Sequence, residues 1–355
     1  MRAIRYEAAA FGGPIEPVAR ELPDPKGAEV VVEISHCGVC HTDVHVHEGS
    51  YDLGGGRTMR FSERGVTPPI TLGHEIVGRA VAAGPDATIE LGTRVSVYPW
   101  IGCGNCFRCD EENDHLCADA AFLGIFRAGG YASHVTVPSP RYLVPIANID
   151  SATAAPFACS GLTSFSAIRK IDATPRHAAV AVFGCGGLGL TAVALLKRTG
   201  YERVVALDPD AKKRALAKEL GAETTLDPSE LDGQALSTAC GAPLLAALDF
   251  VGNESTTGLA IAALAKGGTL VIVGLFGGEL RHPLPFFPVR ALSVVGSYVG
   301  GLGELRDYVE HVRIHGAPAL PTVTMPMSDA GAALSALAQG EIYGRAILVN
   351  EDAPA

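Results

Sequence analysis

The sequence lacks three features that would place it in other classes of protein. Its 28 lysines and arginines are outnumbered by 38 aspartates and glutamates, and the formal net charge of -10 provides no positive field for nucleic acid or an anionic membrane. No run of about 18 apolar residues occurs, and the N-terminus lacks a signal-peptide pattern. We therefore expect a cytoplasmic protein with small-molecule partners, bound neither to nucleic acid nor to a membrane.

Aromatic and charged residues are scarce, at 6% and 19%, whereas apolar residues make up 48% of the chain and glycine occurs 42 times. A disordered chain would combine low hydrophobicity with a high fraction of charge, so this composition indicates compact, folded domains. The 355 residues are enough for about two domains, each with a substantial core.

The two halves of the chain differ in pattern. Residues 28–150 contain short strand-like runs, such as 29–34 and 94–98, separated by glycine and proline, which indicates a mostly-β region. Beyond residue 151 strands alternate with apolar helices, which predicts a parallel sheet. These predicted elements are the strands 178–183 and 204–207 and the helices 188–199 and 211–220. The tail mixes helices at 303–315 and 327–337 with a strand at 346–349, and we assign it to the first region.

A glycine-rich loop follows the first strand of the second region. Gly184, Gly186 and Gly189 fit the pattern G-x-G-x-x-G after the apolar run 180–183 and at the start of a helix. Glycines in that position let the backbone approach a pyrophosphate, and Asp208 at the end of the next strand is placed to accept hydrogen bonds from ribose hydroxyls. Since this carboxylate would repel a 2'-phosphate, the sequence favours NAD over NADP. The alternative is a tight strand-to-helix turn without a nucleotide.

The chain has nine cysteines, an odd number. Four of them lie within fifteen residues, at Cys103, Cys106, Cys109 and Cys117. In a reducing compartment such clustering favours metal thiolates over disulfides. Four sulfurs can enclose one tetrahedral zinc ion and leave no open coordination position, which indicates a structural site. An iron–sulfur cluster is the alternative, and it would colour the protein brown.

A second group of potential ligands, Cys40, His74 and Cys159, is spread along the chain. Each residue alone is more typical of a buried filler or a satisfied histidine. Together two cysteines and one histidine form the ligand set of a catalytic zinc that keeps a position open for water or substrate. Cys37 competes with Cys40 as the first ligand.

On these motifs the chain resembles the zinc-dependent medium-chain alcohol dehydrogenases over nearly its whole length. The family signature G-H-E-x2-G-x5-G appears as Gly73-His74-Glu75 with Gly78 and Gly84. The resemblance implies an α/β architecture: a GroES-like, mostly-β catalytic domain (residues 1–160 and 300–355) and a Rossmann domain with a doubly wound parallel sheet (residues 161–299). It further implies two zinc ions per chain, NAD, and a homodimer or homotetramer whose subunits meet near residues 292–299.

The resemblance also implies roles for individual residues. The family pattern C-[HR]-[ST]-D selects Cys40 over Cys37, so Cys40, His74 and Cys159 hold the catalytic zinc and the four clustered cysteines hold the structural one. Thr42 and His45 form a proton relay, Asp43 accepts a hydrogen bond from His74, and Glu75 lies behind the metal unless it merely pairs with an arginine. The cofactor-binding residues are His41, Thr163, Gly184, Gly186, Gly187, Leu188, Gly189, Asp208, Lys213, Val273 and Arg345. Among them, His41 and Arg345 are assigned to the pyrophosphate and Lys213 to a ribose.

The activity that follows is reversible oxidation of an alcohol to an aldehyde or ketone with NAD. Zinc lowers the pKa of a bound oxygen from about 16 to about 7, which makes an alkoxide available for hydride transfer. Trp100, Phe122, Phe126 and Phe276 favour a hydrophobic pocket for aliphatic or aromatic, primary or secondary alcohols. A polyol, sugar or thiol-adduct dehydrogenase of the same superfamily is the alternative.

The segment between Cys40 and His74 is roughly a dozen residues longer than the resemblance leads us to expect. The extra residues fall within 50–69, where they form either a lid or wall of the substrate cleft or a surface excursion or subunit contact. Arg57, Arg60 and Arg64 make this segment locally basic, but Asp52 and Glu63 largely offset their charge. The sequence therefore gives no reason to expect an acidic substrate.

Overall fold

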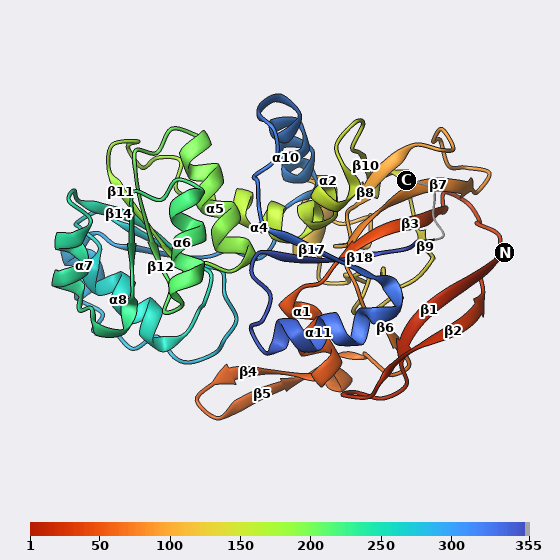
Figure 1. Ribbon diagram of the computed structural model, residues 1–355, viewed down its shortest axis with the longest axis horizontal. Helices are drawn as coiled ribbons and strands as arrows, with labels where there is room; N and C mark the ends of the chain where they lie inside the picture. Colours follow the sequence, from red (N-terminus) through yellow and green to blue (C-terminus); the bar gives the residue numbers. More distant parts are fainter. Residues whose placement is uncertain (352–355) are drawn as a thin grey trace.

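The computed structural model describes residues 1–351 and has two domains side by side (Figure 1). One domain is built mainly from antiparallel sheets and the other from a parallel sheet flanked by helices. The predicted fold class, a mostly-β domain joined to a doubly wound α/β domain, is confirmed. No helix among residues 1–351 is long and apolar enough to cross a membrane.

The first domain contains two main sheets and a two-stranded hairpin. One has the strand order β2-β1-β6, and the other has the order β10-β8-β7-β3-β18-β17, with β9 pairing beside β3. The bounds are β1 (Arg2–Ala8), β2 (Ile15–Glu21), β3 (Val30–Gly38), β6 (Ile70–Thr71), β7 (Glu75–Ala83), β8 (Arg94–Val97), β9 (His134–Val137), β10 (Leu143–Pro145), β17 (Thr322–Pro326) and β18 (Arg345–Val349). Strand β3 is almost entirely buried because it lies in the middle of the larger sheet.

The C-terminal tail lies in the first domain. Strand β18 pairs antiparallel with β3, with Leu348 opposite Cys37, and parallel with β17. The predicted helix at 327–337 begins as a 3-10 turn, Met327–Asp329, and becomes α11 (Ala330–Ala338). The tail thus completes the sheet that carries Cys37 and Glu75.

The second domain is a six-stranded parallel sheet with the order β13-β12-β11-β14-β15-β16. Numbered within this domain the order is 3-2-1-4-5-6, that of a dinucleotide-binding fold. The strands are β11 (Ala179–Phe183), β12 (Arg203–Leu207), β13 (Thr224–Leu226), β14 (Leu244–Asp249), β15 (Thr269–Ile272) and β16 (Ser293–Gly296). The helices are α5 (Gly187–Arg198), α6 (Ala211–Glu219), α7 (Gly233–Ala239), α8 (Glu254–Ala263) and α9 (Phe286–Arg290). All five residues of β11 are buried and apolar, as expected for a strand covered on both faces.

Helices α4 (Ser160–Arg169) and α10 (Leu302–His315) lie at the junction of the two domains (Figure 1). The first domain also contains α1 (His41–Glu48), α2 (Phe107–Asp110) and α3 (Ser151–Ala154). Helix α4 packs against both α5 and α10, and the Ser164 hydroxyl donates to the Leu188 carbonyl at 2.9 Å. This contact fixes the glycine loop of the second domain relative to α4.

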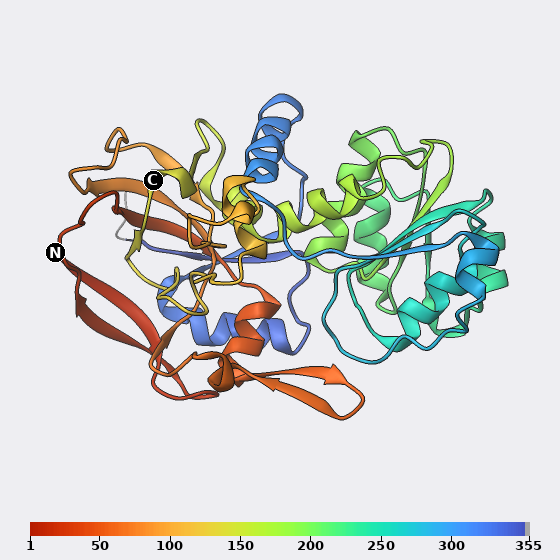
Figure 2. The same cartoon turned by 180° about the vertical axis from the view of Figure 1, so that it is seen from behind.

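The residues inserted between Cys40 and His74 form a hairpin of β4 (Ser50–Gly54) and β5 (Arg57–Arg60), followed by a 3-10 turn, η1 (Phe61–Arg64). In both Figure 1 and Figure 2 the hairpin extends from the first domain toward the second. A Cβ on Gly54 would lie 2.3 Å from the Gly278 carbonyl oxygen, and Gly54 has a φ of 79°, so only glycine fits this contact. The hairpin therefore touches the second domain across the interdomain cleft.

Candidate active site

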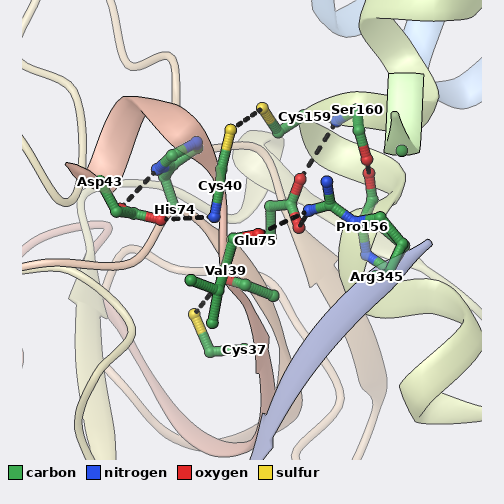
Figure 3. A network of polar contacts seen from close by, with 12 residues as sticks. Cys37, Val39, Cys40, Asp43, His74, Glu75, Pro156, Cys159, Ser160 and Arg345 are labelled. Carbon is green, nitrogen blue, oxygen red and sulfur yellow. Dashed lines mark hydrogen bonds and ion pairs between the residues drawn. The ribbon is translucent and has the colours of Figure 1, made fainter. Parts of the chain in front are cut away.

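Three distant segments bring Cys40, His74 and Cys159 together. Cys40 lies at the N-terminus of α1, His74 precedes β7, and Cys159 precedes α4. One ligand atom from each residue lies within 4.8 Å of the others, and the Cys40 and Cys159 sulfurs are 3.9 Å apart (Figure 3). All three side chains are buried. Two sulfurs and one imidazole at this spacing can hold a zinc ion and leave one position open.

Asp43 organises this group through four hydrogen bonds. Its Oδ1 accepts from His74 Nδ1 at 3.1 Å and from the Gly73 N–H at 3.0 Å. Its Oδ2 accepts from the Cys40 N–H at 3.0 Å and the Tyr131 hydroxyl at 3.3 Å. Because Nδ1 is the donor to Asp43, His74 Nε2 is left buried with no hydrogen-bond partner among residues 1–351. An orphaned imidazole nitrogen beside two sulfurs fits a metal ligand whose orientation is fixed from behind.

The protonation of the group follows from these contacts. The hydrogen bond from Cys159 holds the pKa of the Cys40 thiol well below its usual value, against the effect of burial. The same bond and burial raise the pKa of Cys159. Burial alone would lower the pKa of His74, but the Asp43 carboxylate raises it well above the usual range. The site is thus already arranged to favour a thiolate at Cys40.

Cys37 lies outside the group. Figure 3 shows Cys37 on the opposite side of Val39 from the Cys40 and Cys159 sulfurs, and its Sγ approaches the Gly38 carbonyl at 3.6 Å. A Cβ on Gly73 or Gly130 would lie within 2.8 Å of the Cys37 sulfur, so this thiol fills space between neighbouring backbones. Burial raises the pKa of Cys37, as expected for an unreactive packed thiol.

Glu75 pairs with Arg345 behind the group. Arg345 donates to a Glu75 carboxylate oxygen and to the Val39 carbonyl, and the Ser160 N–H donates to the other Glu75 oxygen at 3.2 Å. A Cβ on Gly38 would lie 1.9 Å from the Glu75 carboxylate, so this glycine makes room for the pair. Pairing with an arginine is the alternative role that the sequence analysis gives for Glu75, and the structure shows this pair. The assignment of Arg345 to the pyrophosphate stays a prediction: its guanidinium pairs with Glu75, its Cδ lies next to Gly187 of the glycine loop, and its buried Nε has no partner within the described residues.

Thr42 and His45 lie on α1, and Tyr51 of the hairpin lies close to both. The Thr42 side chain lowers the pKa of the Tyr51 hydroxyl against the effect of burial, and the Tyr51 ring centroid lies 4.4 Å from that of His45. Burial lowers the pKa of His45, although Glu48 at 3.9 Å opposes this effect. A neutral imidazole near neutral pH is a suitable proton acceptor.

The glycine loop has the geometry expected for a pyrophosphate site. A Cβ on Gly189 would lie 1.7 Å from the Gly184 carbonyl, so helix α5 begins in direct contact with the end of β11. A Cβ on Gly187 would lie 2.7 Å from Arg345 Cδ, whereas Gly186 has no atom within 4 Å of its Cβ position and leaves open space. This open space beside the N-terminus of α5 fits an anionic ligand.

Other residues of the predicted cofactor set surround this loop. Asp208 accepts from the Cys185 N–H at 2.8 Å and the Asp210 N–H at 2.9 Å, so both oxygens retain further capacity to accept. Lys213 lies on α6, within the electrostatic reach of Asp210. His41 lies 5.9 Å from the Phe276 ring. Phe276 was expected to line the substrate pocket, but it is 58% exposed and borders a separate polar recess with His45 and Asn253.

A cavity of about 510 Å³ lies between the domains. The first domain contributes Cys40, Thr42 and Cys159 to its wall, and the second domain contributes Leu188 and Val273; Thr163 of α4 lies between them. Apolar and aromatic groups form most of the remaining wall, namely Leu53, Met59, Phe61, Trp100, Phe122, Ile125, Phe126, Leu275, Tyr298 and Val299. Trp100 is held by its Nε1–H, which donates to the Ala158 carbonyl at 2.8 Å. Such a cavity fits a small, largely apolar ligand.

The four clustered cysteines form a second, local group. Their ligand atoms lie within 4.8 Å of one another, and the Cys106 and Cys109 sulfurs are 3.6 Å apart. The Gly104 N–H donates to Cys109 Sγ at 3.3 Å, and the Cys109 N–H lowers the pKa of Cys106 to about 7. Backbone N–H groups directed at sulfur are the surroundings of a metal thiolate site, and four sulfurs leave no ligand position open.

Sequence reasoning missed three tyrosines. Tyr131 holds Asp43, Tyr51 contacts Thr42 and His45, and Tyr298 lines the cavity. Tyr51 lies in the insertion that was singled out, but no local signal marks Tyr131 or Tyr298. Their roles depend on contacts between segments far apart in the sequence.

The fold and the two cysteine groups define a two-domain, metal-binding, nucleotide-dependent dehydrogenase. Residues 26–148 match the alcohol dehydrogenase GroES-like domain, and residues 187–313 match the zinc-binding dehydrogenase domain. An NAD-dependent alcohol dehydrogenase of Sulfurisphaera tokodaii is 32% identical over 352 residues, which cover 98% of this chain and 100% of the relative. The chain therefore belongs to the zinc-type medium-chain dehydrogenase/reductase family.

Solved structures agree with this family. The alcohol dehydrogenase from Aeropyrum pernix is 29% identical with a TM-score of 0.87, and the match covers 98% of this chain and 100% of that one. The D-arabinose dehydrogenase from Sulfolobus solfataricus is 26% identical with a TM-score of 0.83, over 99% of this chain and 100% of that one. The fold therefore serves both alcohol and sugar dehydrogenases, and the choice between them depends on the cavity.

Proposed function

We propose that the chain is a zinc-dependent alcohol dehydrogenase that transfers hydride reversibly between an alcohol and NAD, giving an aldehyde or a ketone. One observation carries this proposal: Cys40 and Cys159 border the same cavity as Leu188 and Val273 of the nucleotide-binding domain. Hydride transfer needs the activated oxygen and the nicotinamide in one water-poor space, and this cavity adjoins both predicted sites.

Each residue of the site has a defined part in this proposal. Cys40, His74 and Cys159 hold a zinc ion, which lowers the pKa of a coordinated oxygen. Asp43 holds the His74 ring so that Nε2 faces the two sulfurs. The Thr42 hydroxyl takes the proton of the substrate hydroxyl as it releases its own, and His45 provides the base from which the released proton passes to solvent. The four-cysteine group holds a second zinc with a structural role.

The largely apolar cavity wall favours an alcohol over a polyol as substrate. A sugar needs several polar groups that converge on its hydroxyls, and Trp100, Phe122, Met59 and Phe61 offer none, although Asp52, Arg64 and Tyr298 also border the cavity. A polyol or sugar dehydrogenase remains the second candidate, since the D-arabinose dehydrogenase shares the fold.

Metal analysis of wild type and the variant Cys159→Ala, combined with NAD reduction over aliphatic, benzylic and cyclic alcohols and a sugar, tests the proposal. Wild type should contain about two zinc ions per chain and the variant about one, with its turnover lost. Cys37→Ala is the matched control, because it removes a buried thiol next to the site and should keep both ions. One zinc in all three proteins and no turnover of any substrate would overturn the proposal.

We further propose a homodimer or homotetramer in the cytoplasm. Strand β16 ends the parallel sheet, and the segments around it expose Leu284, Val289 and Val294, which are 80%, 71% and 36% exposed. An open edge strand with apolar neighbours is typical of a subunit contact. The nine cysteines are all free thiols, and seven belong to the two metal groups, which favours a reducing compartment. Sedimentation velocity would test the oligomeric state.

A further inference from the structure

The fold separates the charges of the inserted segment, which balance one another in the sequence. Arg57 lies 3.9 Å from Glu279 on the second domain. Asp52 Oδ1 accepts the Gly54 N–H at 2.8 Å, and a Cβ on Gly277 would lie 3.3 Å from the Asp52 carboxyl carbon. Arg64, at the end of η1, lines the cavity between the domains, whereas Glu63 does not. The carboxylates that balance the charge of this segment in the sequence therefore do not pair with Arg64 in the folded chain.

Arg64 is the one arginine or lysine in the wall of this cavity among residues 1–351. Within the same described residues it has no carboxylate within 4.0 Å and no hydrogen-bond acceptor. Arg64 and Tyr298 belong to the same wall: burial raises the pKa of Tyr298 to about 12, and the charge of Arg64 opposes that rise. The Tyr298 ring lies 6.1 Å from Trp100, which is itself 5.4 Å from the His74 ring. An aromatic wall thus extends from the predicted zinc site through Trp100 and Tyr298 in the cavity that Arg64 also lines.

Asp52 is the only carboxylate in the wall of this cavity within the described chain, and it forms no ion pair with Arg64 within 4.0 Å. It also borders the polar recess formed with Asn253 and Glu254 of the second domain, which Arg64 does not. Its hydrogen bond to Gly54 holds it within the hairpin. An anion next to Arg64 would therefore meet a cation that has no carboxylate of residues 1–351 within 4.0 Å, beside a largely aromatic wall.

We propose that Arg64 is a specificity-determining residue that selects alcohols or aldehydes with a carboxylate at the end remote from the reacting carbon. The inference rests on the proposed function and names the substrate class of the same cavity. The apolar wall takes the aliphatic or aromatic body of the substrate, and the guanidinium binds the carboxylate through paired N–H groups. Because Arg64 is exposed, we expect a substrate with a carboxylate to be preferred over a neutral substrate by about tenfold.

The test compares kcat/KM for ω-hydroxy carboxylates of increasing chain length with kcat/KM for primary alcohols of matched length. Wild type should prefer the hydroxy acids, with an optimum chain length, and the preference should shrink at high ionic strength. Arg64→Leu should lose about tenfold on the hydroxy acids and little on the alcohols. Arg64→Glu should reverse the preference toward amino alcohols.

Arg60→Glu is the matched control, because it makes the same charge change on β5, four residues away, at an exposed position outside the cavity wall. It should leave the preference unchanged. If wild type oxidises neutral alcohols and hydroxy acids equally well, or if Arg64→Leu keeps the preference, the proposal for Arg64 is overturned while the alcohol dehydrogenase activity stands.

A binding measurement covers the case in which no alcohol is turned over. Calorimetric titration of the zinc-loaded chain with hexanoate should give about tenfold weaker binding for Arg64→Leu than for wild type and Arg60→Glu. Equal affinity in the three proteins would overturn the proposal even without turnover. Loss of turnover alone, with the difference in hexanoate affinity retained, would instead overturn the proposed reaction.

Discussion

The two cysteine groups of this chain differ in how they are assembled. Cys103, Cys106, Cys109 and Cys117 come from one short loop around α2, whereas Cys40, His74 and Cys159 come from three segments joined only by the folded sheet. The first group has four sulfurs and partly exposed members, and the second has three ligands, all buried, beside a cavity. A local loop can enclose an ion, whereas an open catalytic site needs a surrounding fold that excludes water and positions a second substrate.

Each group also has a buried aspartate, and the two aspartates serve different purposes. Asp43 bonds directly to the ligand His74 and to the backbone of Cys40. Asp114 accepts from Tyr142 at 2.8 Å and Arg141 at 2.9 Å and so ties the four-cysteine loop to the chain after β9. One carboxylate orients a ligand, and the other anchors a loop.

Removal of the local metal site gives the largest expected effect on stability. Cys109→Ala should lower the zinc content to about one ion per chain and the free energy of unfolding by on the order of 5 kcal/mol, because metal binding and folding of the loop are coupled. Thermal unfolding and metal analysis measure both quantities. Cys240→Ala, a buried thiol of the second domain outside both groups, is the control and should keep two ions. Loss of the other ion in Cys109→Ala would contradict the separation of the two sites.

The paired substitutions Asp43→Asn and Asp114→Asn sharpen the contrast between the aspartates. Asp43→Asn removes the charge that raises the pKa of His74 and should reduce zinc affinity at that site or turnover by about 10–100-fold. Asp114→Asn should instead lower the free energy of unfolding by about 1–3 kcal/mol, since it weakens buried hydrogen bonds, and leave turnover close to wild type. Equal effects of both substitutions on turnover would show that Asp43 acts only as an anchor.

A further difference between the two groups is the hairpin, which covers the proton path of the group formed by Cys40, His74 and Cys159. Oxidation needs neutral His45, and burial lowers the pKa of His45, so turnover should hold until the pH falls below the usual value of 6.5. Tyr51→Ala exposes the imidazole and raises its pKa, so turnover should fall at a higher pH than in wild type. The pH profile of kcat measures this shift.

Tyr51→Phe provides a finer comparison at the same position. It keeps the ring that covers His45 and removes the hydroxyl that contacts Thr42, so kcat should fall a few-fold with no shift of the pH profile. Tyr201→Phe is the control, because it removes a hydroxyl bonded to the Ile171 carbonyl outside the cleft. An unchanged profile in Tyr51→Ala would contradict a covering role for the hairpin.

The local motifs could be predicted from the sequence because their geometry is set over a few residues. The four-cysteine loop, the glycine turn after β11 and the nucleotide-binding strand pattern are all of this kind. The catalytic group required the family resemblance, since nothing in the spacing of Cys37 and Cys40 shows which thiol faces His74. In the structure the start of α1 after Cys40 decides this, with the Cys40 N–H bonded to Asp43.

Contacts across the domain junction could not be predicted. The pairing of Glu75 with Arg345 depends on β18 joining the sheet, and the isolation of Arg64 depends on how the hairpin crosses the cleft. In the sequence, the positive and negative charges of the insertion largely cancel when they are summed. In the fold, these charged side chains lie on different surfaces. The direction in which such side chains point depends on packing between segments that are far apart in the chain, and a single sequence does not show this packing.

The return of the tail to the first sheet has a consequence for synthesis on the ribosome. Strand β3 is translated before the parallel domain, whereas its neighbour β18 follows that domain. The parallel domain has all its strands before β18 appears, so it can fold while the Cys37 end of β3, beyond its pairing with β9, still presents an open edge. The nascent chain therefore carries a folded insert inside an unfinished sheet, and a stop codon that removes β18 would leave that edge exposed for aggregation.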